Sequence, residues 1–209
     1  MKILITDDHA VIRRGLKQIL LEEFPSAEIS EATDAESAIS QSLSGNFDVI
    51  ISDLSMPGRS GLDLVFHMRQ QQSKTPVLIL SMHPEEQYAI RALKAGAAGY
   101  LSKETAPEEL VKAVNRVLQG RKYISASIAD KLFDELDQPA NEKPVHEQLS
   151  HREFDVFKLI AGGKSVSEIS DQLTLSISTV STYRARILTK MRMKSNAELT
   201  RYALEHKLI

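Results

Sequence analysis

The sequence of 209 residues contains no cysteine, which excludes disulfide bonds, thiolate zinc sites and thiol nucleophiles. It also lacks an apolar run near the roughly 18 residues that a membrane-spanning helix requires. The apolar stretch that follows Met1 is too short for the core of a signal peptide. We therefore expect a cytoplasmic globular protein with no membrane partner, in line with its 42% hydrophobic and 26% charged residues.

Internal repeats and low-complexity tracts are absent as well, which argues against a solenoid. A chain of 209 residues can form one large domain or two small ones, each with its own core. Residues 138–146 are polar and rich in turn-forming residues, so we expect a linker there. The preceding residues suggest a helix through the spacing of Ile128, Leu132, Phe133 and Leu136.

Acidic residues are missing from one long stretch near the C-terminus. None occurs between Asp171 and Glu198, although this stretch contains Arg184, Arg186, Lys190, Arg192 and Lys194. Residues 1–144 have a net charge of −5, from 16 Lys+Arg and 21 Asp+Glu, and residues 145–209 a net charge of +3, from 10 and 7. Such a basic segment is either a solvated helix face or a surface that binds phosphate groups.

Short apolar runs alternate with segments of helical periodicity over the first 120 residues. Strands are predicted at residues 3–6, 27–30, 49–52, 77–80 and 99–101, and helices at about 11–20, 35–43, 62–71, 85–94 and 108–118. Parallel neighbouring strands need helical crossovers, so five such units predict a doubly wound α/β sheet of the flavodoxin-like type.

Beyond the linker the hydrophobic spacing is purely helical and predicts a small all-α bundle of four helices. Gly162 and Gly163 are expected to end its first helix, and Ser176 or Ser178 to cap its third. Residues 166–173 and 178–190 have the layout of a helix-turn-helix, whose second helix lies in the major groove of DNA.

Polar residues follow four of the predicted strands. Asp7 and Asp8 follow the first, Asp53 the third, Ser81 the fourth and Lys103 the fifth. Because ligands bind at the carboxyl ends of parallel strands, these side chains are expected to meet in one cleft. Three carboxylates so close resist ionisation unless a cation such as Mg²⁺ lies between them. Asp53 is then a candidate nucleophile for phosphoryl transfer, with Lys103 and Ser81 stabilising the phosphoryl oxygens.

Each of these residues also has an ordinary explanation. Asp8 could cap the first helix, Lys103 could be a solvated lysine, and a serine after a strand carries little information by itself. Their occurrence together at four strand ends favours a functional site.

The motifs that carry these residues resemble the receiver domains of two-component response regulators over about residues 1–120. They are D-D-H at 7–9, D-L-S-M-P-G-R-S-G at 53–61, L-I-L-S at 78–81 and A-G-A-A-G-Y-L-S-K at 95–103. The resemblance implies that Asp53 accepts a phosphoryl group from a histidine kinase. It also implies that Asp8, Asp53 and the Ser55 carbonyl bind Mg²⁺ directly, and that Asp7 assists through water.

The same resemblance assigns a switch role to Ser81 and Tyr100, with the hydroxyl moving toward the phosphate and the tyrosine ring turning inward. Ser55 and His83 occupy family positions that tune the lifetime of the phosphoryl group. Receivers commonly carry proline after the lysine, whereas Glu104 follows Lys103 here. A non-proline cis bond costs about 2.5–4 kcal/mol, so we expect a trans bond.

The C-terminal segment of about residues 148–209 resembles the DNA-binding domain of NarL/FixJ (LuxR-type) regulators. The matching stretches are L-S-H-R-E, V-F-K-L-I-A-G-G-K-S, E-I-S and L-S-I-S-T-V-S-T-Y-R-A-R-I-L-T-K-M. Many members have lysine at the position of Ser181 and histidine at that of Tyr183, a departure that leaves DNA binding as the expectation but leaves open which bases are read. In the second helix Val180, Tyr183 or Arg184, Ile187 and Met191 would be buried. The expected DNA contacts are Ser178, Thr179, Ser181, Thr182, Arg184, Arg186 and Lys190.

We therefore expect a phosphorylation-controlled transcriptional regulator that dimerises when phosphorylated and binds promoter DNA, and not an enzyme acting on other substrates. The predicted domains are a receiver at 1–120, a helical segment and linker at 121–147, and a helix-turn-helix domain at 148–209. One alternative is a phosphohydrolase of the haloacid dehalogenase type, although that group has a second aspartate where Ser55 stands. Another is a signalling adaptor whose helical domain binds protein.

Overall fold

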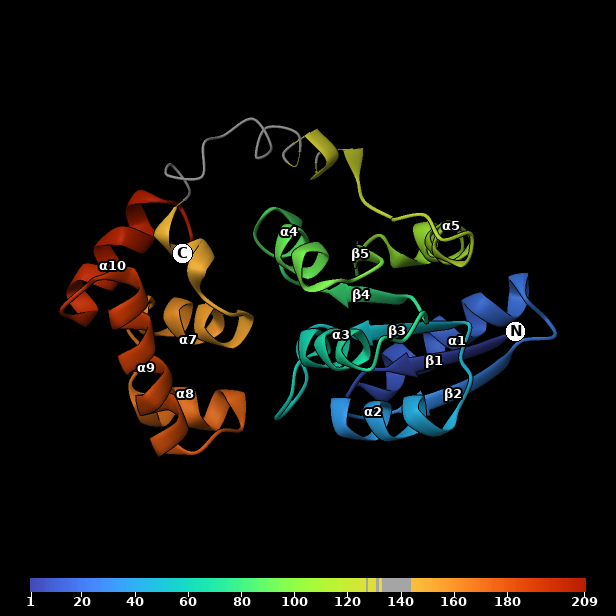
Figure 1. The fold of residues 1–209 in the computed structure, drawn as a ribbon, viewed down its shortest axis with the longest axis horizontal. Helices are drawn as coiled ribbons and strands as arrows, with labels where there is room; N and C mark the ends of the chain where they lie inside the picture. The colour runs from blue at the N-terminus through green and yellow to red at the C-terminus, as the bar shows by residue number, and fades with distance from the viewer. Residues whose placement is uncertain (127, 131, 133–143) are drawn as a thin grey trace. The chain divides into compact units, whose positions relative to one another are not determined.

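The computed structural model describes residues 1–126, 128–130, 132 and 144–209 (Figure 1). The chain divides into two compact units between residues 134 and 135, and each unit is described by itself. Within the described ranges, none of the helices combines the length and apolar character needed to cross a membrane. The helix predicted before the linker lies largely outside the described residues, because Phe133 and Leu136 fall in the gap.

The first unit is built on a sheet of five parallel strands in the order β2-β1-β3-β4-β5. The strands are β1 (Lys2–Thr6), β2 (Glu28–Ala32), β3 (Val49–Asp53), β4 (Val77–Ser81) and β5 (Gly99–Ser102). This order confirms the predicted flavodoxin-like fold. Strand order reverses between β1 and β3, which is where ligands of such sheets bind.

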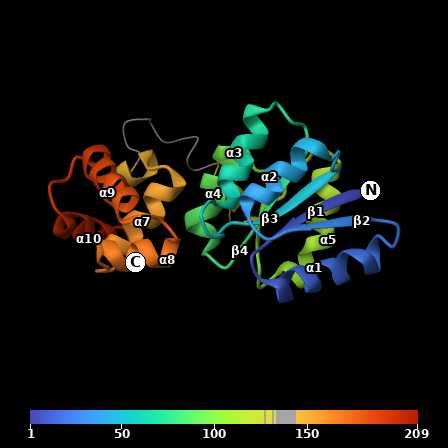
Figure 2. The ribbon, with the colours of Figure 1, turned by 90° about the horizontal axis from the view of Figure 1, so that it is seen from below.

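Helices cover both faces of the sheet. Figure 2 shows α1 (Ala10–Glu23) and α5 (Ala106–Leu118) on one face and α2 (Ala35–Ser44), α3 (Gly61–Gln70) and α4 (Glu85–Ala95) on the other. In β1, β3 and β4 residues of both faces are buried, as in the run Ile3, Leu4 and Ile5, so these strands do not alternate, whereas the edge strand β2 is partly exposed. The helix boundaries agree with the predicted ones to within about three residues, the largest difference being the C-terminal end of α1 at Glu23.

The start of α3 is pressed against the end of β3. Ser60 caps α3 through a reciprocal pair of hydrogen bonds with Asp63. A Cβ atom on Gly61 would collide with the backbone oxygen of Asp53, so only glycine fits at this position. Ser60 and Gly61 thereby hold the segment after Asp53 close to the carboxyl end of the sheet.

The core of the first unit continues past residue 120. Tyr123 forms a parallel bridge with Gly99 and is 6% exposed. It packs with residues of β1, β3, β4, α1 and α5 in one cluster. The apolar periodicity of the preceding helix did not indicate this contact.

The second unit contains η2 (Val145–Gln148), α7 (His151–Ala161), α8 (Val166–Leu173), α9 (Ile177–Met191) and α10 (Asn196–Glu205). The short 3-10 helix η2 was not predicted. Ser176 caps α9, and Gly162 ends α7 with Gly163 at φ +87°, as expected. The core of this bundle includes Phe154, Phe157, Ile169, Val180, Ile187, Met191, Leu199 and Ala203.

Candidate functional site

The carboxyl ends of the strands bring acidic side chains and one lysine together. Asp53 ends β3, Asp7 directly follows β1 and Lys103 directly follows β5. The Lys103 Nζ atom lies 2.7 Å from Asp7 Oδ2 and 2.8 Å from Asp53 Oδ2. All three groups are nearly inaccessible, since their side chains are 8%, 1% and 5% exposed. One ammonium group therefore bridges two buried carboxylates.

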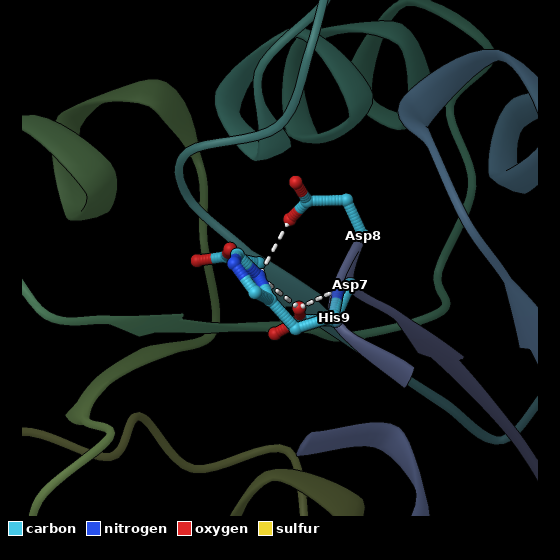
Figure 3. Close-up of side chains that lie close together, drawn as sticks. Asp7, Asp8 and His9 are labelled. Carbon is cyan, nitrogen blue, oxygen red and sulfur yellow. Dashed lines mark hydrogen bonds and ion pairs between the residues drawn. The ribbon is translucent and has the colours of Figure 1, made fainter. Parts of the chain in front are cut away.

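Asp8 and His9 lie beside Asp7 (Figure 3). We call the group of Asp7, Asp8, His9 and Asp53 the acidic edge. His9 Nδ1 lies 2.9 Å from Asp8 Oδ1 and 3.1 Å from Asp7 Oδ1, and the His9 backbone N–H donates to the same Asp7 oxygen at 2.7 Å. Ligand atoms of Asp7, Asp8, His9 and Asp53 all lie within 4.8 Å of one another. With 30% of its side chain exposed, Asp8 is the most accessible of the three carboxylates.

This donor set fits Mg²⁺. The cluster contains three carboxylates and one ammonium group, so it keeps a surplus of negative charge when His9 is neutral. Oxygen ligands of this kind are those that Mg²⁺ prefers. The Ser55 backbone N–H donates to Asp53 Oδ1 at 3.3 Å, which places the loop after β3 beside the cluster. Ligation by the Ser55 carbonyl stays a prediction.

Burial dominates the acid–base chemistry of the pair. Burial raises the pKa of Asp53, and the hydrogen bond from Lys103 offsets this only partly. Burial alone would lower the pKa of Lys103, but its hydrogen bonds to Asp53 and Asp7 outweigh that cost and raise it. Lys103 is therefore held as a cation next to a carboxylate that is costly to keep charged.

Ser81 and Tyr100 lie behind the cluster on β4 and β5. Ser81 is fully buried, and its Oγ accepts a hydrogen bond from the His83 backbone N–H at 3.0 Å. The Tyr100 ring is turned inward, with 1% of the residue exposed, and its hydroxyl donates to the His83 carbonyl at 3.0 Å. Burial raises the pKa of Tyr100 to about 12. Both members of the predicted switch pair thus bind the same loop.

The loops after β3 and β4 are joined at the rim of the cluster. Ser55 Oγ and His83 Nε2 lie 2.8 Å apart. The His83 ring stacks on Tyr88 with a centroid distance of 4.6 Å. The sequence singled out both positions but not this hydrogen bond, which joins residues 28 positions apart.

The loop that carries Lys103 is formed without proline. All peptide bonds of the described residues are trans, as expected for the bond to Glu104. The Lys103 backbone N–H donates to the Ser81 carbonyl at 2.9 Å, and the Glu104 N–H donates to Ser102 Oγ at 3.2 Å. These two hydrogen bonds fix the turn between β5 and α5.

Sequence analysis missed Arg13, a residue of the first turns of α1 whose guanidinium reaches the acidic edge. Its Nη1 atom donates to the Asp7 carbonyl at 2.7 Å. The only sequence signal is its position four residues after His9, which turns it back toward the preceding loop on a helix.

The second unit presents the predicted helix-turn-helix through α8 and α9. Ser178, Ser181, Thr182 and Arg186 are exposed, and Thr179 is half-buried. Among the described residues, Arg186 has no ion-pair partner. The other two basic residues among the predicted DNA contacts, Arg184 and Lys190, have partners on α10 and α7 that the sequence did not reveal. Arg184 Nε donates to Asn196 Oδ1 at 2.8 Å, and Lys190 Nζ lies 2.6 Å from Oε2 of the buried Glu153.

Comparison with known families agrees with both units. The response regulator receiver domain family matches residues 3–115, and the luxR family of bacterial regulatory proteins matches residues 147–203. The chain belongs to the response regulators of the NarL/FixJ type, which join a receiver to a LuxR-type helix-turn-helix. It is a transcription regulator controlled by phosphorylation.

Particular relatives span the whole chain. The response regulator UvrY of Escherichia coli K12 is 34% identical over 208 residues, which cover 100% of this chain and 95% of UvrY. The oxygen regulatory protein NreC of Staphylococcus epidermidis ATCC 12228 is 37% identical over 216 residues, covering 100% and 99%. A solved structure of RcsB from Salmonella enterica serovar Typhimurium, bound to promoter rprA with phosphomimetic BeF3-, matches with a TM-score of 0.59 and 26% identity. That match covers 97% of this chain and 98% of RcsB.

Proposed function

We propose that Asp53 accepts a phosphoryl group from a sensor histidine kinase and that this modification controls promoter binding by α9. The observation that carries this proposal is the Lys103 ammonium group, which lies within 2.8 Å of both Asp53 and Asp7 at the carboxyl edge of the sheet. In the transfer, an Asp53 carboxylate oxygen attacks phosphorus while the bond to the kinase histidine nitrogen breaks. The electron pair of that bond stays on the nitrogen.

Each neighbour of Asp53 has a role in this step. Lys103 holds the carboxylate before transfer and a phosphoryl oxygen afterwards. Ser81 Oγ, which accepts from the His83 N–H in this structure, would turn to donate to a second phosphoryl oxygen. The loop that Ser81 releases is also bound by Tyr100, so the two residues would move together as the switch.

The transfer is proposed to depend on Mg²⁺ held by Asp8, Asp53 and the Ser55 carbonyl, with Asp7 acting through water. When bound, Mg²⁺ would neutralise charge on the phosphoryl oxygens. The surplus of carboxylates over Lys103 supports this choice of ion, since a divalent cation offsets their mutual repulsion.

The output is proposed to be dimerisation and DNA binding in the cytoplasm, by a receiver at 1–120, a connecting segment at 121–147 and a helix-turn-helix domain at 148–209. The RcsB structure was solved on a promoter with a phosphomimetic, which supports a similar output here. Ser181, Thr182 and Arg186 are the accessible candidates for contacts with DNA, together with Ser178 and Thr179. Arg184 and Lys190 already contact Asn196 and Glu153, so each would bind a phosphate while keeping that partner.

A direct test uses the full chain with acetyl phosphate and Mg²⁺, followed by mass spectrometry of the modified residue. Asp53→Asn should abolish labelling, and Asp171→Asn, the same change on the exposed face of α8, should leave it intact. Acid-labile labelling that persists in Asp53→Asn would exclude Asp53 as the acceptor. Genomic DNA capture before and after phosphorylation then tests the output, with enrichment of discrete promoters expected only afterwards. Repeated turnover of small phosphomonoesters would instead favour the phosphohydrolase.

A further inference from the structure

We infer that Arg13 is a positioning residue for the acidic edge, because its guanidinium fixes the peptide group that joins Asp7 to Asp8. This inference rests on the proposed Mg²⁺ site and names a residue that would set its affinity. Arg13 does not touch the carboxylates themselves and acts only through the backbone.

The contact lies at the carbonyl of Asp7. Arg13 Nη1 donates to this oxygen at 2.7 Å, a short hydrogen bond from a charged donor. The carbonyl belongs to the same planar peptide group as the N–H of Asp8. Fixing the plane therefore fixes the direction in which the chain leaves Asp7 and reaches Asp8.

The other side of the guanidinium is anchored to the sheet. Arg13 Nε donates to Glu31 Oε2 at 3.1 Å, and Glu31 lies on β2, paired with Ile5 of β1. The Arg13 side chain is 12% exposed, so water screens this pair only partly. The hydrogen bond from Arg13 is the main reason that the pKa of Glu31 is lowered, and Lys17 contributes on the exposed side.

This arrangement uses a property that arginine has and lysine lacks. The guanidinium presents several N–H groups in one rigid plane, so it binds Glu31 with one nitrogen and Asp7 with another. The opposite side of the Asp7 residue is held by a longer hydrogen bond, from its N–H to the Ala32 carbonyl at 3.3 Å. Loss of Arg13 would leave the Asp7–Asp8 peptide with little to fix its plane.

The consequence should be greatest for Asp8. Asp7 is held from its side chain by Lys103 and the His9 N–H, whereas the Asp8 side chain is 30% exposed and, within the part of the chain that the structure describes, forms an ion pair only with His9. The orientation of the Asp8 carboxylate therefore depends mainly on its backbone. Groups that orient metal ligands typically change metal affinity about 10-fold to 100-fold when removed.

A simpler view is that Arg13 only ties α1 to β2 and stabilises the fold. The two views differ in what changes. A merely structural role would lower the melting temperature and leave the Mg²⁺ affinity of the folded chain unchanged. A positioning role would weaken Mg²⁺ binding in protein that is fully folded.

The experiment is isothermal titration calorimetry, in which Mg²⁺ is titrated into the full chain at a temperature where every variant is folded. Arg13→Ala should bind Mg²⁺ about tenfold more weakly, and Arg13→Lys should recover only part of the loss. Lys17→Met is the matched control, because it removes a cation from the same Glu31 without touching Asp7, and it should bind as the parent does. In phosphorylation by acetyl phosphate, the Mg²⁺ concentration for half-maximal rate should rise about tenfold in Arg13→Ala, with the maximal rate within about twofold of the parent.

The outcomes separate this inference from the proposed function. Equal Mg²⁺ affinity in Arg13→Ala and the parent, with loss of binding in Asp53→Asn, would overturn the role of Arg13 and keep the metal site. No Mg²⁺ binding by the parent would overturn the metal site itself. If Arg13→Ala does not fold, Glu31→Gln decides, since it weakens the anchor while keeping a neutral acceptor. A drop in affinity of about threefold is then expected, and no drop would contradict the inference.

Discussion

The two units each contain a lysine that binds a buried carboxylate, and the two clusters differ in charge balance. In the second unit Lys190 lies 2.6 Å from Glu153, which also accepts from the Ser150 N–H at 2.7 Å. In the first unit Lys103 faces both Asp7 and Asp53, with Asp8 nearby. The first cluster has more carboxylates than cations, whereas the second is balanced.

The pKa values follow this difference. Burial alone would raise the pKa of Glu153, but the hydrogen bonds from Lys190 and Ser150 outweigh it and lower the pKa. For Asp53, burial raises the pKa despite Lys103, and the charge of Asp7 adds to the effect. A satisfied carboxylate is typical of a structural site, while an unbalanced one is typical of a site that binds a further cation. The two lysines also differ in exposure, since the Lys190 side chain is 41% exposed and the Lys103 side chain only 8%.

The largest expected effect comes from removing each lysine in turn. Lys103→Met should slow phosphorylation by acetyl phosphate about 100-fold to 1,000-fold, because the transferred group loses a preorganised cation. Lys190→Met should leave that rate unchanged. Rates of label incorporation at saturating Mg²⁺ provide the comparison, and equal rates in both variants would remove the distinction between the clusters.

Removing a carboxylate should lower the stability of the second unit but not that of the first. Glu153→Ala takes away both the capping partner of Ser150 and the partner of Lys190, so the free energy of unfolding of the second unit should fall by about 2 kcal/mol. Asp53→Asn should not destabilise the first unit, since it relieves repulsion with Asp7. Urea unfolding followed by circular dichroism and by NMR signals of each unit measures both. A loss of stability in Asp53→Asn as large as that in Glu153→Ala would contradict the comparison.

Arg186 and Lys190 should differ in DNA binding to a smaller extent. Arg186→Ala removes an exposed cation of α9, so the slope of log affinity against log salt should become shallower by about one unit. Lys190→Met should change the slope less, because Lys190 is bound to Glu153. Fluorescence anisotropy with a captured promoter duplex at several salt concentrations tests this, and equal changes would show that Lys190 also contacts phosphate.

The smallest expected effect is a dependence of stability on pH. The pKa of Glu153 is lowered in the folded state, so its ionised form stabilises the second unit above the ordinary pKa of a glutamate. This contribution is lost as the pH falls through the lowered pKa. The stability difference between the parent and Glu153→Gln should therefore be largest above the ordinary glutamate pKa of about 4.5 and should shrink as the pH falls below it. A difference that grows in acid would contradict the assignment.

Local sequence patterns predicted the elements but not the long-range pairs. The runs around Ile3 and Ile51 and the caps at Ser176 and Gly162 depend on neighbouring residues, so periodicity and composition reveal them. Asp7, Asp53 and Lys103 could be placed together because parallel strands end at one edge. The contacts of Arg13 with Glu31 and of Lys190 with Glu153 could not, since they join residues 18 and 37 positions apart. Only the three-dimensional packing of a helix on a strand, or of one helix on another, brings such charges into contact.

The most direct test of the comparison is a titration of Mg²⁺ into two variants of the full chain, each with one carboxylate neutralised in a different cluster. Asp8→Asn removes an accessible carboxylate of the first cluster without touching Lys103, and Glu153→Gln makes the matched change in the second. We predict that Asp8→Asn loses most of the Mg²⁺ binding of the parent and that Glu153→Gln retains it. Undiminished Mg²⁺ affinity in Asp8→Asn would contradict the claim that the unbalanced charge at the sheet edge is a metal site.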